Sequence, residues 1–142
     1  MKTVKQLLDE KGRDVWTIDP DLSVYDAVKL MADKGIGALV VVKDAKPVGM
    51  ITERDYARKV VLKGKSSQQA LVSQIMTTPI LCVRLGQSVE DCMALMTEKR
   101  VRHLPVVEND KLIGLVSIGD LVKAIIAEQQ FIIQQLEHYI SG

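Results

Sequence analysis

Aromatic residues, cysteines and histidines are scarce in this chain of 142 residues. Aromatic side chains make up 4% of the sequence, and there are two cysteines and two histidines. With so few aromatic residues, a folded core must be built from aliphatic side chains. The proportions of 47% hydrophobic and 26% charged residues are those of an ordinary globular domain and exclude a disordered chain. The length fits one compact domain.

An excess of charge of either sign is also missing, because the net charge is +1. Such a chain has no general attraction to nucleic acid or to an anionic membrane. The first residues contain no apolar segment of a signal peptide, and no window reaches the roughly 18 apolar residues of a membrane span. These absences predict a cytoplasmic protein that binds neither nucleic acid nor membrane.

Motifs for catalysis and for metal binding are absent as well. The sequence contains no HExxH, CxxC or P-loop pattern. Cys82 and Cys92 lack the spacing of metal ligands, and we expect both to be small buried residues, one in a strand and one in a helix. We therefore expect a protein with no metal site, no catalytic residue and no enzymatic activity.

What the sequence does contain is a tandem repeat. Residues 15–61 and 80–126 align without a gap at an offset of 65. A repeat of this length predicts two copies of one supersecondary unit, each too small to bury its own apolar face. Pairing the copies creates a shared core and two related clefts. This arrangement favours ligand binding in a pseudo-symmetric module.

Hydrophobic periodicity and turn residues predict the order β-α-β-β-α in each repeat. The two repeats are preceded by similar short helices near residues 3–8 and 71–76, and a polar connector covers residues 63–68. The expected elements are strands 15–18, 39–43 and 48–52 with helices from Ser23 and from 52 or 53 to about 62, then a strand near 80–83, a helix over 88–99, strands 104–107 and 112–117, and a helix over 118–140.

The last predicted helix is longer than its counterpart in the first repeat. It carries Leu121, Ile125, Phe131 and further apolar residues as far as Ile140, more than one sheet needs to cover. A helix that outlasts its repeat indicates a partner, most simply a second copy of the protein. The alternative is that the helix packs back on its own domain.

Each repeat places a hydroxyl residue at the end of a strand and an aspartate three residues later: Thr52 and Asp55, then Ser117 and Asp120. A helix N-terminus with such a hydroxyl suits a phosphate, and a carboxylate one turn further can accept hydrogen bonds from a ribose diol. The alternative is a simple helix capping box, which the sequence also contains at residues 23–26 and 88–91.

The turns before the buried strands form the other half of these candidate sites. An apolar residue there can cover an adenine, and small residues allow close approach of the backbone. Nearby basic residues can reach a phosphate, although solvated surface charge is the alternative. The turn residues are Ile36, Gly37, Ala38, Val101, Arg102 and His103, and the basic residues are Arg54, Arg58, Arg100 and Arg102.

On these residues the chain resembles a tandem pair of CBS domains, or Bateman module. The similarity rests on the segments 39–42 with 48–55 and 103–107 with 112–120, and on the Met-Thr-Thr-Pro of residues 76–79. It implies an α/β (α+β) fold in which two β-α-β-β-α repeats, residues 1–66 and 67–142, pack with pseudo-two-fold symmetry. The family also implies a homodimer.

The resemblance further implies an adenosyl ligand: AMP first, with ATP, ADP, NAD(H) and S-adenosylmethionine as alternatives. The two copies differ at several of the implied positions, so equal affinity at both sites is not expected. The full set of candidate ligand-binding residues is Thr17, Ile18, Ile36, Gly37, Ala38, Thr52, Arg54, Asp55, Arg58, Cys82, Val83, Val101, Arg102, His103, Pro105, Ser117, Gly119 and Asp120.

The leading hypothesis is therefore an adenine-nucleotide sensor that regulates another, unidentified protein. The alternative is a ligand-free interaction module that works through its last helix. Nucleic-acid binding through the basic turns is disfavoured by the near-neutral charge, and no sequence feature names a substrate for an enzyme.

Overall fold

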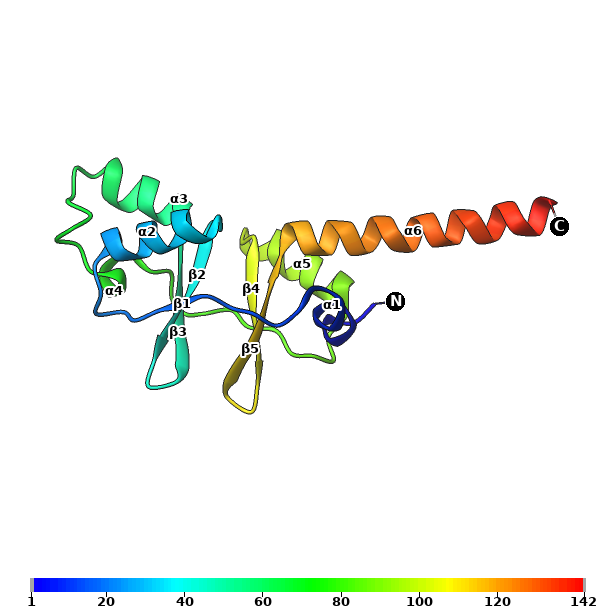
Figure 1. Ribbon diagram of the computed structural model, residues 1–142, viewed down its shortest axis with the longest axis horizontal. Coiled ribbons are helices and arrows are strands. Elements are labelled where there is room, and N and C mark those ends of the chain that lie inside the picture. The colour runs from blue at the N-terminus through cyan, green and yellow to red at the C-terminus, as the bar shows by residue number, and fades with distance from the viewer. Residues whose placement is uncertain (1, 142) are drawn as a thin grey trace.

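The computed structural model describes residues 2–141, and its strands form two small sheets (Figure 1). One sheet has the order β1-β2-β3 and the other consists of β4 and β5. The mixed content of helix and strand confirms the predicted α+β fold. In chain order the elements are α1 (Val4–Lys11), β1 (Thr17–Ile18), α2 (Val24–Lys34), β2 (Ala38–Lys43), β3 (Lys46–Thr52), α3 (Glu53–Tyr56), the π-helix η1 (Ala57–Val61), α4 (Val72–Ile75), α5 (Val89–Lys99), β4 (His103–Glu108), β5 (Lys111–Ser117) and α6 (Ile118–Ser141).

Both predicted hairpins are present, and each turns on two residues with positive φ. These are Asp44 and Ala45 between β2 and β3, and Asn109 and Asp110 between β4 and β5. Two such residues match the twist of the flanking strands. The first turn is therefore shorter than the predicted segment 44–47, because β3 already begins at Lys46.

The strand predicted near residues 80–83 is wrong. Only Val83 forms a bridge, parallel to Val106, whereas β1 pairs over two residues with β2. In the first repeat the Val40 amide donates to the Trp16 carbonyl at 3.3 Å. The equivalent of Val40 is Pro105, which has no N–H to donate, so this rung of the ladder is lost.

Cys82 lies in this segment, and its predicted burial is also wrong. The side chain is exposed, because no strand forms around it to turn it into the core. Cys92 is buried in α5, as predicted, and burial raises the pKa of its thiol to about 11.

Each lead-in helix packs on the core of the other repeat. In α1, Val4, Leu7 and Leu8 join the core of the second repeat, while Val72 and Ile75 of α4 join that of the first. Backbone hydrogen bonds fasten both contacts, from the Val4 amide to the carbonyl of residue 87 at 2.8 Å and from Val72 to that of residue 22 at 2.9 Å. The packing units therefore cross the boundary predicted at residue 66.

Two glycines at equivalent strand positions allow this exchange. A Cβ atom on Gly114 would lie 2.7 Å from Cδ1 of Leu8 in α1. A Cβ atom on Gly49 would lie 2.8 Å from Sδ of Met76 and 3.1 Å from the carbonyl oxygen of Thr77. Strands β3 and β5 therefore each have a residue without a side chain at the point where the lead-in segment of the other repeat crosses them.

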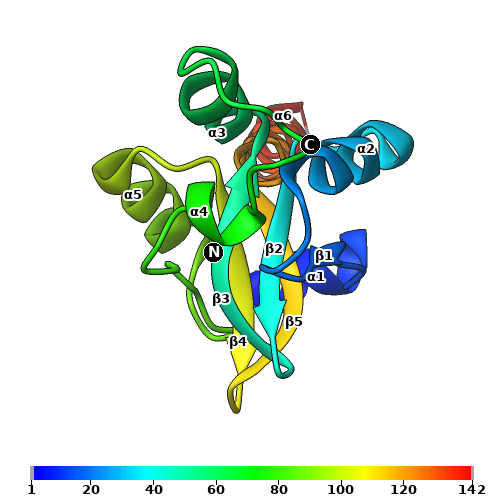
Figure 2. The same cartoon turned by 90° about the vertical axis from the view of Figure 1, so that its left-hand side faces the viewer.

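The two hairpins lie side by side, as Figures 1 and 2 both show. A third apolar cluster lies between the sheets, formed by Ala38, Val40 and Met50 with the partly buried Leu112 and Leu115. The fold is therefore two similar halves joined by crossed lead-in segments and an apolar interface, which places the start of α3 and the start of α6 at equivalent positions.

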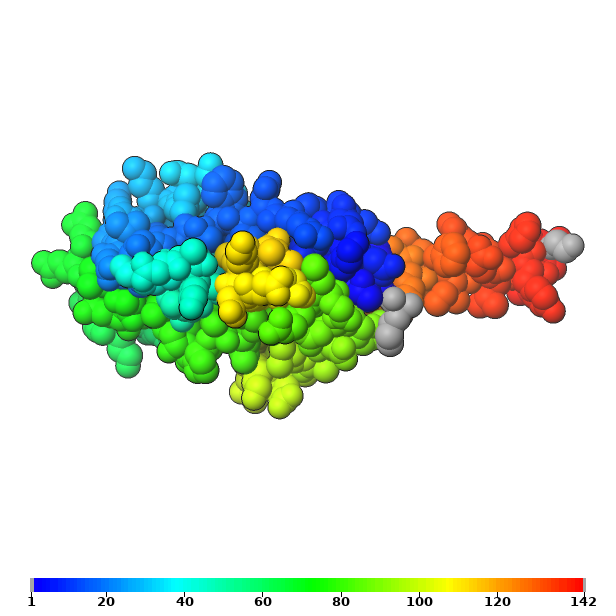
Figure 3. Space-filling view, turned by 90° about the horizontal axis from the view of Figure 1, so that it is seen from below, coloured from blue at the N-terminus to red at the C-terminus, as the bar shows by residue number. Residues whose placement is uncertain are grey.

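The end of α6 leaves this body. Its buried residues are Leu121 and Ala124, and every side chain over residues 129–141 is exposed. In the space-filling view this end projects alone from the rest of the molecule (Figure 3). The apolar surface predicted for the last helix is therefore unpaired within the described part of the chain.

Candidate functional site

The two hydroxyl–aspartate pairs form reciprocal caps at the starts of α3 and α6. Asp55 N donates to Thr52 Oγ1 at 3.1 Å, and Thr52 N donates to Asp55 Oδ2 at 3.0 Å. The same two bonds join Ser117 and Asp120, at 3.1 and 2.9 Å. The predicted capping boxes are therefore present at both sites. What distinguishes the sites is how the remaining atoms of each pair are bonded.

At the first cap, both carboxylate oxygens of Asp55 are occupied by protein groups. Oδ1 accepts from Thr77 Oγ1 at 3.2 Å and lies 3.1 Å from Lys59 Nζ. Oδ2 accepts from the Thr52 hydroxyl at 3.1 Å in addition to the amide. The residue is 7% exposed. This cap is closed, because its hydroxyl proton and both carboxylate oxygens already have partners.

At the second cap, one side of Asp120 is available. Oδ2 takes the Ser117 amide and forms an ion pair with Lys11 Nζ, while no protein group among residues 2–141 donates to Oδ1. The Ser117 hydroxyl accepts from Asp120 N, and a hydrogen bond from this side chain also contributes to lowering the pKa of Asp120. The Asp120 side chain is 21% exposed. This cap therefore offers one unused carboxylate oxygen, Asp120 Oδ1, to a ligand.

The charge of Asp120 is stabilised by its partners. Burial alone would raise the pKa of this carboxyl. The hydrogen bonds from Lys11 and from Ser117 lower it by more than burial raises it, so the pKa lies below the ordinary value. Lys11 also donates to the carbonyl oxygen of Leu115 at 2.8 Å. The carboxylate is thus ionised at neutral pH and can accept a hydrogen bond from a hydroxyl group.

The structure brings the predicted turn residues next to the caps. The Gly37 carbonyl accepts from Glu53 N at 3.0 Å, and the Arg102 carbonyl accepts from Ile118 N at 2.9 Å. In the sheets, Ala38 stands opposite Thr52 and His103 stands opposite Ser117. Ile36 and Val101 lead into these turns and are partly buried. Turn and cap therefore form one continuous site in each repeat.

His103 is partly buried beside the second cap. Burial lowers the pKa of its imidazole, and the charges of Lys11 and Arg102 lower it further, against the opposing effect of Asp120. The ring is therefore neutral at pH 7. A neutral ring at this position can both donate and accept a hydrogen bond.

The other candidate residues are dispersed around the two sites. Their positions follow from the strands and helices that carry them. Ile18 and Val83 are buried, Thr17 and Cys82 are exposed, Arg54 and Arg58 are exposed on α3 and η1, Pro105 is buried in β4 beside Val83, and Gly119 is exposed in the first turn of α6.

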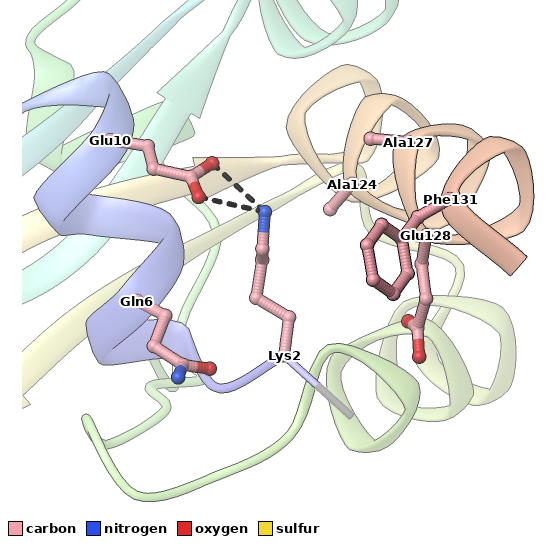
Figure 4. A pocket seen from close by; sticks show the side chains of 7 residues that line it. All are labelled: Lys2, Gln6, Glu10, Ala124, Ala127, Glu128 and Phe131. Carbon is pink, nitrogen blue, oxygen red and sulfur yellow. Dashed lines mark hydrogen bonds and ion pairs between the residues drawn. The ribbon is translucent and has the colours of Figure 1, made fainter. Parts of the chain in front are cut away.

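Two cavities lie against helices rather than at the caps. The larger, of about 430 Å³, lies between α1 and α6, and the Lys2–Glu10 ion pair and Phe131 face it (Figure 4). The smaller, of about 340 Å³, lies between α2 and α3 and is lined in part by Glu53 and Tyr56. Neither cavity includes the Ser117–Asp120 cap, so a ligand at this cap would bind on a more open surface.

Sequence reasoning missed three residues that decide the state of the caps: Lys11, Lys59 and Thr77. A signal existed for Lys59, because it lies four residues after Asp55 on one helix. No local pattern links Lys11 to Asp120, which is 109 residues away. The contact from Thr77 likewise depends on the crossing of the lead-in segments.

Two further properties follow from the described residues. Within residues 2–141, no three His, Cys, Asp or Glu side chains gather as they would around a metal ion. Over the same range, no helix combines the length and the apolar character needed to cross a membrane.

Comparison with known proteins identifies the fold. The CBS-domain family matches residues 4–62 and 72–127. The mitochondrial CBS domain-containing protein CBSX3 of Arabidopsis thaliana is 41% identical over 99% of this chain and 72% of its own length. A solved CBS-domain protein of Burkholderia ambifaria is 55% identical, with a TM-score of 0.86 over 90% of this chain and 96% of that chain.

A more distant structure shares the fold. The CBS domain pair of protein MJ0100 was solved in complex with 5′-methylthioadenosine and S-adenosyl-L-methionine. It is 23% identical, with a TM-score of 0.80 over 90% of this chain and 98% of that chain.

Proposed function

The chain belongs to the CBS-domain family, and we propose that it is a regulatory module that binds an adenine nucleotide at the Ser117–Asp120 cap. CBS pairs are regulatory modules. The observation that carries the proposal is the unused oxygen Asp120 Oδ1, which lies beside the Ser117 hydroxyl at the start of α6. A donor and an anionic acceptor one helical turn apart match a phosphate and a ribose hydroxyl.

In the bound state, the Ser117 hydroxyl donates to a phosphate oxygen at the N-terminus of α6, where the helix dipole favours negative charge. Asp120 Oδ1 accepts from the ribose. Arg102 and Lys11 supply positive charge near the phosphate. AMP is the first candidate, followed by ADP, ATP, NAD(H) and S-adenosylmethionine. The adenosyl ligands of the MJ0100 domain pair support this class of ligand.

The first cap has a different role in this proposal. Asp55 is buried and fully bonded, so a ribose would have to displace Thr77 or Lys59 from it. We assign Thr52 and Asp55 to holding the fold, with one nucleotide per chain at the second cap.

Regulation would act through Lys11. This side chain joins α1 to Asp120, and a ligand that changes this ion pair changes how firmly α1 is tied to the start of α6. A ligand shifts such an equilibrium only by its differential affinity for the two arrangements. The regulated protein would then distinguish the arrangement with the Lys11–Asp120 ion pair from the arrangement without it.

The test is a calorimetric titration of nucleotide-stripped protein with AMP, ATP, NADH and S-adenosylmethionine. We expect saturable binding with one site per chain. Asp120→Ala should weaken it at least about tenfold, because a hydrogen bond to a charged group contributes roughly 1.5–3 kcal/mol. Unchanged affinity in Asp120→Ala would refute the assignment of the site.

Two variants serve as controls. Asp91→Ala removes an exposed carboxylate from the same kind of capping box, at the start of α5, and should leave binding unchanged. Asp55→Ala should also retain binding under conditions in which it is folded. If Asp55→Ala alone abolishes binding, the ligand occupies the first cap instead.

A ligand-free interaction module is the second candidate, favoured by the exposed apolar side chains at the end of α6. The absence of heat with all four ligands, together with an unshifted melting temperature, would favour this function.

A further inference from the structure

The projecting end of α6 carries large apolar side chains that do not pack against the rest of its own domain. Over residues 129–141 every side chain is exposed, and the large apolar ones are between 50% and 85% exposed. Helices of this length are marginal in water without tertiary packing. Contiguous exposed apolar surface of this kind marks an interface. The surface is not needed for the nucleotide site, and it therefore calls for a partner of its own.

The exposed residues follow a heptad pattern. Ile126, Ile133 and Ile140 are spaced seven residues apart, and they are 49%, 53% and 83% exposed. Val122, Gln129 and Leu136 alternate with them at intervals of three and four residues. Mostly apolar a and d positions that repeat every seven residues are the pattern of a coiled coil. We call these six residues the α6 seam.

The seam faces away from the body. The side of α6 that contacts the body carries Leu121 and Ala124, which are buried, and Phe131, which faces α1 across the larger cavity (Figure 4). On a helical wheel these positions lie roughly opposite the a and d positions. A second helix can therefore lie along the seam, over about 27 Å for 18 residues, without displacing α1 or α5.

We propose that the α6 seam pairs antiparallel with the α6 seam of a second copy of this chain. Centred on residue 131, this pairing places Val122 against the partner's Ile140, Ile126 against the partner's Leu136 and Gln129 against the partner's Ile133. Four of the six layers formed in this way are apolar on both sides. The seam is self-complementary, so the same patch serves both copies.

Charge decides the orientation. In the antiparallel register, Lys123 on the flank of the seam lies opposite the partner's Glu137, and the two-fold symmetry makes this ion pair twice. The other flank is apolar, with Ile132 meeting the partner's Ile132. In a parallel pair Glu137 would lie beside an isoleucine, and two Gln129 side chains would face each other in the seam. Complementary charges therefore select the antiparallel arrangement.

The pairing is favoured further because its helix is already formed. The buried Leu121 and Ala124 hold the first turns of α6 in the folded domain. Because these turns are already helical, the rest of the helix extends from them without a new, unfavourable nucleation step. Between residues 129 and 141 the sequence contains four glutamines and only one acidic residue, Glu137, so two copies meet with little repulsion.

The first test is the mass of the full chain in solution, by analytical ultracentrifugation. The variant Ile133→Glu places a charge in the seam and should halve the mass of the assembly. Phe131→Glu makes the same change on the opposite face and should leave the mass unchanged. Circular-dichroism melts report whether each body remains folded. An unchanged mass in Ile133→Glu, or equal loss in both variants, would overturn the proposal.

Cysteine cross-linking tests the orientation, in a Cys82→Ala background because Cys82 is exposed. In the antiparallel pair, position 132 meets its own copy, whereas position 133 faces the partner's Gln129. Mild oxidation should therefore link Ile132→Cys into a covalent dimer and leave Ile133→Cys unlinked. Efficient linking of Ile133→Cys alone would indicate a parallel pair and overturn the register.

Charge reversal supplies a second measure. Lys123→Glu should weaken the dimer about fivefold, since two exposed ion pairs of roughly 0.5 kcal/mol each are lost. The double variant Lys123→Glu/Glu137→Lys should restore the wild-type dissociation constant. If the double variant is weaker than the single one, the two residues do not face each other.

Discussion

The caps at the starts of α3 and α6 are equivalent positions of one repeat, yet one is closed and the other is open. Thr52 with Asp55 and Ser117 with Asp120 make the same reciprocal backbone bonds. Asp55 nevertheless has protein partners on both oxygens, while Asp120 has them on one. The difference shows that the motif sets the backbone geometry, and residues outside the motif set whether a ligand can reach it.

Those outside residues are not matched between the repeats. Lys59, which pairs with Asp55, corresponds to Ala124, and Lys11, which pairs with Asp120, corresponds to Met76. Thr77 is held in place by two backbone hydrogen bonds to Met50, at 2.7 and 3.2 Å. Lys11 reaches its cap only through a long side chain that is 34% exposed. The first cap is therefore bonded to a hydroxyl on a fixed segment as well as to Lys59, and the second has, within residues 2–141, a lysine side chain as its only partner outside the motif.

The largest difference in stability between equivalent variants of the two repeats is expected for alanine substitutions of the strand glycines Gly49 and Gly114. Gly49→Ala should destabilise the protein by about 3 kcal/mol and Gly114→Ala by about 1 kcal/mol, within the usual range for overpacking. The reason is that the added methyl group of Gly49→Ala meets the Thr77 carbonyl as well as Met76, whereas that of Gly114→Ala meets the end of the Leu8 side chain. Urea unfolding measures both.

The control is a second substitution that removes the clash between the added methyl group and Leu8. Leu8→Ala creates space at Gly114, so Gly114→Ala should cost little in that background. Equal costs for the two glycine variants in the wild type would mean that the lead-in segments cross both strands in the same way.

Much of this comparison could be predicted from sequence. The repeat, the hairpins, the helix starts and the two caps are local patterns, and the structure confirms them. The strand near residues 80–83 is absent because Pro105 cannot donate a hydrogen bond, and this signal was present in the sequence.

The state of the caps could not be predicted. It depends on which repeat each lead-in helix packs against, and the apolar residues of α1 and α4 would suit either core. The contact between Lys11 and Asp120 follows from that choice and spans 109 residues. Interactions of this kind arise from tertiary packing rather than from local pattern.

The second-largest difference in stability is expected between variants of the two cap aspartates, Asp55 and Asp120. Asp55→Ala should lower the free energy of unfolding by about 2–3 kcal/mol, since it removes a cap and buried hydrogen bonds to charged groups. Asp120→Ala should cost about 1 kcal/mol, the usual value for a cap. The exposed box at Asp91 is the matched control, and Asp91→Ala should cost no more than Asp120→Ala. A larger loss in Asp120→Ala than in Asp55→Ala would reverse the roles of the two caps.

The smallest effect is expected from His103, whose counterpart in the first repeat is Ala38. Because burial and the nearby Lys11 and Arg102 lower the pKa of His103 in the folded state, the unfolded chain binds more protons below about pH 6.5. Stability should therefore fall as pH drops from 7 towards 5, and His103→Ala should make this fall shallower by giving the second repeat the residue of the first. Urea unfolding across this pH range measures the slope, with His138→Ala, on the exposed end of α6, as the control. A slope unchanged by His103→Ala would show that the pKa of His103 is the same in the folded and unfolded states. A His103 resonance titrating above the value of a free histidine in NMR would show that Asp120 outweighs burial and favours the charged imidazole.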